Sequence, residues 1–277
     1  KLVAKFLPCW AVTSLSAKGR IPFSPAIYDL LVIDEASQCD IASMLPLLYR
    51  TKRVVIIGDN KQLPHISSIS KKQDVSLLQK YNVDYEWTYS SNSIFDLAGI
   101  VNTSPSIVNL LDHHRSFADI IEFSNKEFYG GKLRVATDYR KLKLPKNEAA
   151  GVRWIDVKGK VLKPYNGGAF NNAEIKQIIE ELNRLAIQND YQGSIGVVTP
   201  FRVQADKIRD EIEKLPELKN RLYAQNDFLV DTVHKFQGDE RDVIIFSSVI
   251  SQNTPLGAII FLKNTGNLFN VAITRAR

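Results

Sequence analysis

Short apolar runs alternate along this chain with amphipathic helical patterns. The apolar runs are LLVI (30–33), RVVIIGD (53–59), SIGVVTP (194–200) and DVIIFSSV (242–249). They lack the polar–apolar alternation of a half-exposed strand. Such continuous apolar runs are typical of parallel strands buried on both faces. Strand alternating with helix predicts an α/β fold with a mostly parallel sheet.

Three segments show helical spacing of apolar residues, and two of them carry capping signals. Asn171 or Asn172 is expected to cap a helix that continues to residue 187. Ser116 and Asp119 have a spacing that resembles a capping box at the start of a second helix. The third segment, 201–215, carries an apolar stripe formed by Val203, Ile208, Ile212 and Leu215.

The chain is long enough for one large or two medium domains, since it has 277 residues. We expect two lobes, residues 1–110 and 111–277. Segment 66–93 is polar and weakly periodic, so we interpret it as an insertion or a mobile loop within the first lobe. The chain begins at Lys1 and its only methionine is Met44, so we expect a piece of a longer protein.

Composition excludes several classes of protein. No apolar run approaches the roughly 20 residues of a membrane-spanning helix, so no membrane association is expected. Cys9 and Cys39 offer neither a disulfide framework nor a zinc site, which favours a cytoplasmic location. The net charge of +6 permits a polyanionic partner without requiring one.

Two adjacent carboxylates, Asp34 and Glu35, directly follow the first apolar run. An ionised carboxylate out of water is unfavourable unless something compensates its charge, although the pair could also simply begin a solvated loop. Ligands of open parallel sheets bind beyond the carboxyl ends of the strands, where Gly58, Asp59 and Gln62 also follow the next apolar run. An acid pair there can hold Mg²⁺ and activate a water, while a glutamine reaches a terminal phosphate.

Six segments occur in the order of the helicase motifs of superfamily 1. They are VIDEASQCD, GDNKQLP, LLDHHRS, VVTPFRVQ, VDTVHKFQGDERDVIIFS and FNVAITRAR. The chain most resembles the branch that includes the nonsense-mediated decay helicase and its bacterial relatives. The resemblance implies RecA-like parallel sheets with flanking helices, comprising the end of the first lobe and the second lobe. It also implies an ATP-dependent helicase or translocase of the 5′-to-3′ branch.

The resemblance assigns roles to individual residues. Asp34 would bind Mg²⁺ and Glu35 would activate the hydrolytic water. Gln62, Arg115 and Arg275 would contact the γ-phosphate of ATP, and Gly238 and Glu240 would lie at the phosphates and ribose. Single-stranded nucleic acid would be contacted by Thr13, Ser14, Thr199, Gln204, Thr232 and His234. If the source is bacterial, we expect this strand to be DNA in preference to RNA.

The chain departs from the family pattern in one major respect. No G-x-x-x-x-G-K-[ST] phosphate loop occurs in the 277 residues, so we expect the C-terminal portion of a helicase core that hydrolyses ATP negligibly by itself. His114 stands where the family commonly has tyrosine and His65 where it commonly has proline, and neither position carries the chemistry.

Two other classes of function are alternatives to a helicase for this sequence. One is a catalytically inactive module that keeps the fold to bind nucleic acid or protein, which the intact acid pair and motif arginines disfavour. The other is an NTPase unrelated to nucleic acid, which leaves VVTPFRVQ and VDTVHKFQG unexplained.

Overall fold

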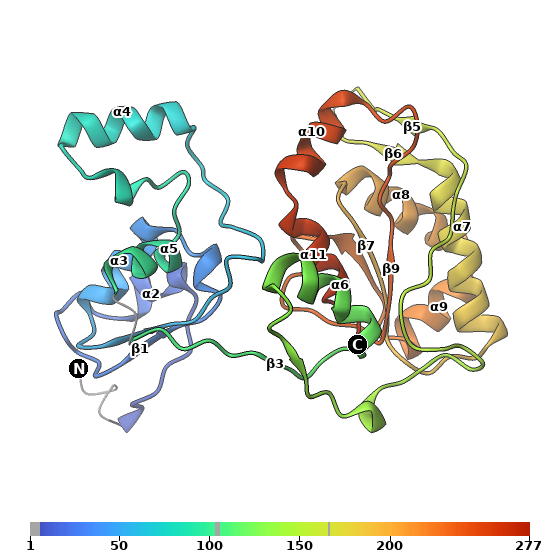
Figure 1. The fold of residues 1–277 in the computed structure, drawn as a ribbon, viewed down its shortest axis with the longest axis horizontal. Coiled ribbons are helices and arrows are strands. Elements are labelled where there is room, and N and C mark those ends of the chain that lie inside the picture. The colour runs from blue at the N-terminus through green and yellow to red at the C-terminus, as the bar shows by residue number, and fades with distance from the viewer. Residues whose placement is uncertain (1–5, 103–105, 166) are drawn as a thin grey trace. The chain divides into compact units, whose positions relative to one another are not determined.

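The computed structural model describes residues 6–102, 106–165 and 167–277 (Figure 1). The chain divides into two compact units, unit 1 (Lys1–Asn109) and unit 2 (Leu110–Arg277). Residues 1–5 and 103–105, which the predicted first lobe includes, lie outside the described part of the chain.

Unit 1 is a small parallel sheet with helices. Its elements are α2 (Ser14–Arg20), β1 (Leu31–Ile33), η1 (Ala36–Gln38), α3 (Ile41–Tyr49), β2 (Val54–Ile56), α4 (Lys71–Tyr81), η2 (Tyr85–Trp87) and α5 (Ile94–Val101). Four of the helices begin at a polar cap whose side chain accepts a backbone N–H of the first turn, and these caps are Thr13, Asp40, Ser70 and Ser93. Such caps satisfy backbone donors that have no partner within the helix.

The sheet of unit 1 is covered on one face by the described residues. Ile33 is buried in a cluster with residues of α2, α3 and α5. Leu30, Val32 and Val55 are instead 48%, 54% and 45% exposed. The prediction of strands buried on both faces is therefore wrong for β1 and β2 in this structure, because the helices of unit 1 pack on the opposite face.

Segment 66–93 contains a regular helix, α4, so the interpretation as a loop is wrong for residues 71–81, while the interpretation as an insertion stays a prediction. Ser70 and Gln73 form a capping box at its start, and Asn82 ends it in a left-handed conformation. This start signal is visible in the sequence, but the low apolar content of the helix hides its periodicity. In Figure 1 the helix lies away from α2, α3 and α5.

Unit 2 holds a larger parallel sheet. Its elements are β3 (Asp112–His113), α6 (Ala118–Tyr129), β4 (Arg134–Val135), η4 (Tyr139–Lys141), β5 (Val161–Leu162), β6 (Phe170–Asn171), α7 (Asn172–Asn183), a π-helical turn (Arg184–Gln188), β7 (Ile195–Thr199), α8 (Arg202–Glu213), α9 (Pro216–Gln225), β8 (Leu229–Thr232), β9 (Val243–Phe246), α10 (Leu256–Asn264) and α11 (Asn267–Ile273). Among the described residues, β7 pairs in parallel with β8 on one side and β9 on the other.

Helices cover both faces of the β8–β7–β9 sheet, and every residue of β7 is buried. Figure 1 shows α7, α8 and α9 on one side, and α6 and α11 on the other. On the first side, Ile195 and Val197 of β7 join the core cluster. On the second side, the rings of Phe246 and Phe269 meet edge to face, with centroids 5.5 Å apart. The predicted α/β fold with a parallel sheet is confirmed.

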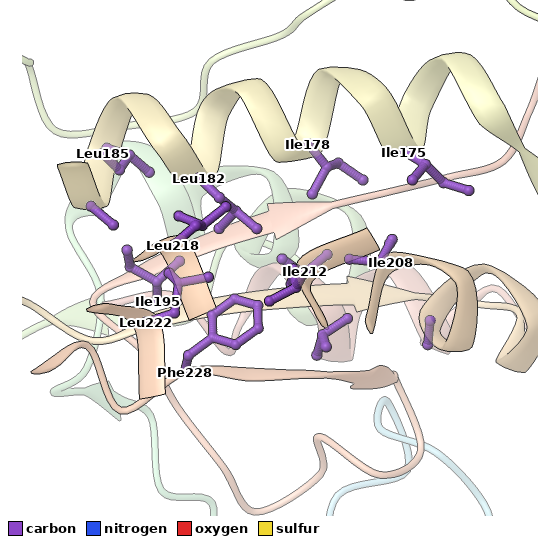
Figure 2. Packing of buried hydrophobic residues seen from close by; sticks show 14 of the residues in the cluster. Ile175, Ile178, Leu182, Leu185, Ile195, Ile208, Ile212, Leu218, Leu222 and Phe228 are labelled. Atoms are coloured by element: carbon purple, nitrogen blue, oxygen red, sulfur yellow. The ribbon is translucent and has the colours of Figure 1, made fainter. Parts of the chain in front are cut away.

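The core beneath α7 explains why its amphipathic pattern is the clearest in the chain. Figure 2 shows its apolar stripe packed over α8, α9 and β7. The residues labelled there are Ile175, Ile178, Leu182, Leu185, Ile195, Ile208, Ile212, Leu218, Leu222 and Phe228. Burying each such side chain contributes about 1.5–3 kcal/mol. Asn171 caps α7, because its Oδ1 accepts the N–H of Ala173 at 3.0 Å. Of the two predicted caps, Asn171 and Asn172, the structure thus shows the first.

Two expectations about helix ends differ from the structure. Ser116 does not cap α6, since its hydroxyl donates to the Ala276 carbonyl at 2.5 Å and no side chain caps that helix. α8 ends at Glu213, which leaves Leu215 41% exposed. In both cases a partner distant in sequence or an early helix end overrides the local pattern.

No single helix in the described part of the chain is long and apolar enough to cross a membrane. Taken together, α10 and α11 reach the required length and apolarity, but they bend by 75° at their junction. Leu268, Val271 and Ala272 of α11 are buried in the core, as expected of a core helix.

Candidate functional site

The loop after β1 carries the predicted acid pair. β1 and β2 run parallel and in register, so Asp34 and Ile57 follow the two strands side by side. The N–H of Ile57 donates to the Ile33 carbonyl and the N–H of Ala36 donates to the Ile57 carbonyl, both at 2.8 Å. Asp34 is exposed, and its Oδ1 accepts the N–H of Glu35 at 3.0 Å. The acid pair thus lies at the carboxyl end of a parallel sheet, where ligands of such sheets bind.

Glu35 has an unusual backbone conformation. Its φ of 51° and ψ of 39° are left-handed, a region that residues other than glycine rarely adopt and that costs about 1–3 kcal/mol. Its Oε2 accepts the side-chain N–H of Gln38 at 2.9 Å. Its carbonyl accepts the Cys39 thiol at 3.6 Å, and burial raises the pKa of that thiol, which keeps the donor proton in place. The surrounding loop therefore fixes the direction of the Glu35 carboxylate.

The loop after β2 carries Gln62 and packs against the loop after β1. A Cβ at Gly58 would lie 3.0 Å from the Ser37 nitrogen, so the backbones of the two loops approach closely. The N–H of His65 donates to the Ser37 carbonyl at 3.2 Å. Within the loop, the side-chain N–H of Gln62 donates to Asp59 Oδ2 at 3.3 Å. Asp34, Glu35 and Gln62 thus come from adjacent loops at the same sheet edge.

The donors of unit 1 fit Mg²⁺ bound together with phosphate. Within the described residues, no group of three or more His, Cys, Asp and Glu side chains lies close enough to hold a metal alone. Mg²⁺ is usually held by one or two carboxylates together with water and substrate phosphates. The exposed carboxylate of Asp34 fits that pattern, and it would hold the ion with phosphate oxygens as the remaining ligands.

A cluster of arginines surrounds Glu240 in unit 2. Arg115 donates its Nε–H to Glu240 Oε2, and its Nη1 donates to the Thr274 carbonyl at 2.9 Å. Arg277 donates from Nε to Glu240 Oε1 at 3.0 Å and also from Nη2. Burial alone would raise the pKa of Glu240, but the hydrogen bonds from the two arginines outweigh it and leave that pKa lowered. Glu240 is therefore an ionised carboxylate shared by two guanidinium groups.

Arg277 is a residue that the sequence analysis left without a role. The signal was present, because it is the second arginine of the ITRAR segment. Arg275, the first arginine, is 3% exposed, and its Nε donates to the Val271 carbonyl at 3.2 Å. The structure thus brings Arg115 and Arg277 together at Glu240, while the guanidinium of Arg275 is buried against α11.

Thr199 and Thr232 end two paired strands. They are direct partners in the register of β7 and β8, so the structure places these two threonines side by side at one sheet edge. Both are buried, with exposures of 0% and 8%. The hydroxyl of Thr199 accepts the N–H of Phe201 at 3.4 Å. Their hydroxyls therefore lie beneath this edge and not on its surface.

Gln204 lies in the interior of unit 2, with 0% exposure. Its Oε1 accepts the N–H of Asn171 at 2.9 Å and its Nε2 donates to Ser247 Oγ at 2.9 Å. Both ends of the amide are thus used to join α8 to β6 and to the end of β9. This placement differs from the predicted direct contact with a strand, because a buried amide that is already hydrogen-bonded offers nothing to an external ligand.

The other predicted strand residues are more accessible. Thr13 is exposed and its Oγ1 accepts the N–H of Ser16 at 3.3 Å as the cap of α2, with half-buried Ser14 beside it. His234 is exposed on the turn after β8, and partial desolvation lowers its pKa below the ordinary value. Thr13 and Ser14 belong to unit 1 and His234 to unit 2.

Residues 233–240 run from the carboxyl end of β8 back to the amino end of β9. Phe236 is fully buried on this path, and a Cβ at Gly196 of β7 would lie 2.8 Å from its ring. Gly238 follows with a φ of 88°, a conformation that favours glycine. This segment joins the sheet edge at Thr232 to the carboxylate of Glu240 at the opposite edge.

Two family matches cover most of the chain. Residues 91–277 match a family described as "AAA domain", and residues 12–68 match a second family with the same description.

Several curated proteins are similar along almost the whole chain. "Uncharacterized ATP-dependent helicase MG140" of Mycoplasma genitalium is 30% identical over 100% of this chain and 25% of its own length. "Helicase sen1" of Schizosaccharomyces pombe is 28% identical over 96% of this chain and 15% of its own length. "DNA replication ATP-dependent helicase/nuclease DNA2" of Gallus gallus is 30% identical over 90% of this chain and 22% of its own length. The chain thus spans a quarter or less of these relatives. It belongs to the AAA domain family, and the superfamily 1 helicase resemblance seen in its motifs is confirmed.

Proposed function

We propose that this chain is part of the motor core of an ATP-dependent helicase that moves along single-stranded nucleic acid. The observation that carries the proposal is the placement of Asp34 and Glu35 at the carboxyl end of β1, beside the loop that holds Gln62. Unit 1 would supply the end of the first RecA-like lobe and unit 2 the second lobe. The free cysteines support the proposed cytoplasmic location.

Each unit carries side chains with a proposed role in ATP hydrolysis. Asp34 would hold Mg²⁺ together with the phosphates of ATP, and the ion would stabilise the charge on those phosphates. Glu35 would orient the attacking water and accept its proton. Gln62, Arg115 and Arg275 contact the γ-phosphate, and positive charge there stabilises the transition state by roughly 10³–10⁵ in rate. Gly238 and Glu240 lie at the phosphates and ribose. For Arg275 this role requires that its buried guanidinium become exposed.

The strand would be bound by Thr13 and Ser14 of unit 1, and by Thr199, Thr232 and His234 at the edge of the unit 2 sheet. For Thr199 and Thr232 this role requires that their buried hydroxyls become exposed. Contacts of this kind go to phosphate and sugar, which position a strand without reading its sequence. The burial of Gln204 supports a role beneath that edge in place of a direct contact. The proposed contacts do not distinguish DNA from RNA, because both present the same backbone charges. Both single-stranded DNA and RNA are therefore tested, with DNA first.

The decisive experiment is Glu35→Gln in the full-length protein. The change keeps the size and hydrogen bonding of the side chain but removes the base, so strand-stimulated hydrolysis should fall by at least about 100-fold, the lower range for a general base. Nucleotide binding, measured with a fluorescent ATP analogue, should be retained.

Glu86→Gln is the matched control, because Glu86 is an exposed carboxylate of the same unit outside the site. Turnover of Glu35→Gln within a few-fold of the wild-type protein would contradict the proposed role of the acid pair.

A second candidate is a binding module without turnover. It is favoured by the burial of Arg275, a proposed ligand of the γ-phosphate, which is only 3% exposed. Strand binding by a full-length protein that shows no hydrolysis under any condition would support it over the motor.

A further inference from the structure

Arg277 donates two hydrogen bonds to one oxygen of Glu240. Its Nε and Nη2 both donate to Oε1, while Oε2 is left to the Nε–H of Arg115. A planar guanidinium that presents two donors to one carboxylate restricts its rotation more than a single donor can. The direction of the Glu240 carboxylate is therefore determined by Arg277.

Arg115 is held from one side and remains open on the other. Its Nε and Nη1 donate to Glu240 and to the Thr274 carbonyl. A guanidinium has five N–H donors, so within the described part of the chain both N–H groups of Nη2 remain for another acceptor. The side chain of Arg115 is 33% exposed, so part of it is accessible to a ligand.

The backbone around the cluster is held by long-range contacts. The N–H of Arg241 donates to the Arg275 carbonyl and the N–H of Arg277 donates to the Arg241 carbonyl, both at 3.0 Å. Arg277 Nη1 also lies 3.8 Å from Asp242 Oδ1, and the other Asp242 oxygen accepts the N–H and hydroxyl of Ser194 at 2.8 Å each. Arg277 is thus anchored to the start of β9.

Charge within the cluster leads to the same conclusion. Arg115, Arg277, Glu240 and Asp242 carry +1, +1, −1 and −1, so the four side chains together are neutral. Without Arg277, the remaining three side chains would carry a net charge of −1. A cluster with a net negative charge attracts an anion less strongly than a neutral one.

We propose that Arg277 is a positioning residue that orients Glu240 and shares its charge, so that Arg115 is presented to the phosphates of a nucleoside triphosphate. The proposal rests on the proposed role of Arg115. Arg277 itself touches neither nucleotide nor strand; it acts through Glu240. The opposite effect of the same contacts would be that Glu240 withholds Arg115 from the nucleotide, and the two effects on kcat differ in sign.

The test is Arg277→Gln in the full-length protein, measured as strand-stimulated ATP hydrolysis. We expect kcat to fall by about 10- to 100-fold, a part of what an arginine at the γ-phosphate contributes. Strand affinity without nucleotide should stay within two-fold or so of the wild-type protein. Arg277→Lys keeps the charge without the planar fork, so its kcat should lie between the two.

Arg184→Gln is the matched control, because Arg184 is also a half-buried arginine that pairs with two carboxylates, Glu148 and Glu181. Its loss tests whether removing any such arginine lowers activity through stability alone. We expect its kcat to equal that of the wild-type protein.

The pH dependence provides a readout that a purely structural role would not change. Arg115 and Arg277 lower the pKa of Glu240, so removal of Arg277 raises it. Protonated Glu240 no longer holds Arg115, and the acid limb of kcat should therefore move to higher pH in Arg277→Gln. Asp239, Arg241 and Asp242 flank Glu240 and are unchanged by the substitution. His113 beside Arg115 has a lowered pKa through burial and that arginine, so it remains neutral near pH 7.

Each outcome decides between the alternatives. A kcat for Arg277→Gln that equals or exceeds the wild-type value overturns the positioning role, and an increase assigns Glu240 to withholding Arg115. Arg115→Ala, measured in parallel, separates the two proposals. If Arg115→Ala hydrolyses ATP normally, the proposed role of Arg115 is wrong, and the role of Arg277 that depends on it is wrong as well. If it is crippled while Arg277→Gln is normal, only the role of Arg277 fails.

Discussion

Gly58→Ala is the perturbation that most directly tests how the two loops of unit 1 are packed. A Cβ at this position would lie 2.7 Å from Phe95 Cδ2, 3.0 Å from Phe95 Cγ and 3.0 Å from the Ser37 nitrogen. Carbon atoms in contact prefer separations of about 3.5–4.0 Å, so each neighbour would have to move by roughly half an ångström or more. The Ser37 nitrogen is backbone, and Phe95 packs against the core cluster of unit 1, so neither moves freely.

The expected cost is about 1–3 kcal/mol, the usual range for an added methyl group in a packed site. For a unit of this size 1 kcal/mol corresponds to roughly 4–8 °C in melting temperature, so unit 1 should melt about 4–24 °C lower. Hydrogen exchange followed by mass spectrometry can assign the loss to peptides of β1, β2 and α5.

Gly99→Ala is the control with the opposite sign. Gly99 lies within α5, and a Cβ there would have no described atom within 4 Å beyond the backbone of its own helix. Alanine should therefore stabilise the helix by about 0.5–1 kcal/mol. Phe95→Leu combined with Gly58→Ala should cost less than the sum of the single changes, because the smaller side chain relieves the clash. A Gly58→Ala protein as stable as the wild type would refute the close approach of the two loops.

Three further predictions concern unit 2. Arg115→Ala and Arg275→Ala should each cripple ATP hydrolysis in the full-length protein and leave strand binding without nucleotide nearly intact. A variant that loses strand affinity but keeps normal turnover would contradict the assignment of its arginine to the γ-phosphate. Gln204→Leu should destabilise unit 2 by about 1–3 kcal/mol in urea unfolding, because the buried Asn171 N–H loses its acceptor and Ser247 Oγ loses a donor. Gln192→Leu at an exposed site should not destabilise it. Burial raises the pKa of Tyr191 above its ordinary value of 10.0, so the unfolded chain ionises first and stability should fall as pH rises above that value. Tyr191→Phe should flatten this alkaline slope, and an unchanged slope would assign it to other groups.

Local pattern was sufficient for much of the fold. The apolar runs at 30–33 and 194–200 became β1 and β7, and the stripe of α7 packs where its periodicity requires. These features depend on residues two to four positions apart, because side chains alternate in strands and recur every 3.6 residues in helices. The placement of Asp34 at a strand end follows from the same local information.

Other features were decided only when distant segments met. Glu240 lies 125 residues from Arg115 and 37 from Arg277, and no spacing rule connects them. Gln204 has the polarity of a surface residue, yet it is buried because Asn171 and Ser247 supply its partners. The sequence by itself therefore determined β1, β2, β7 and β9, the helices α6, α7 and α8, and the order of the motifs. Only the tertiary structure decided which charges pair and which polar groups are buried, because those energies depend on neighbours that folding brings together.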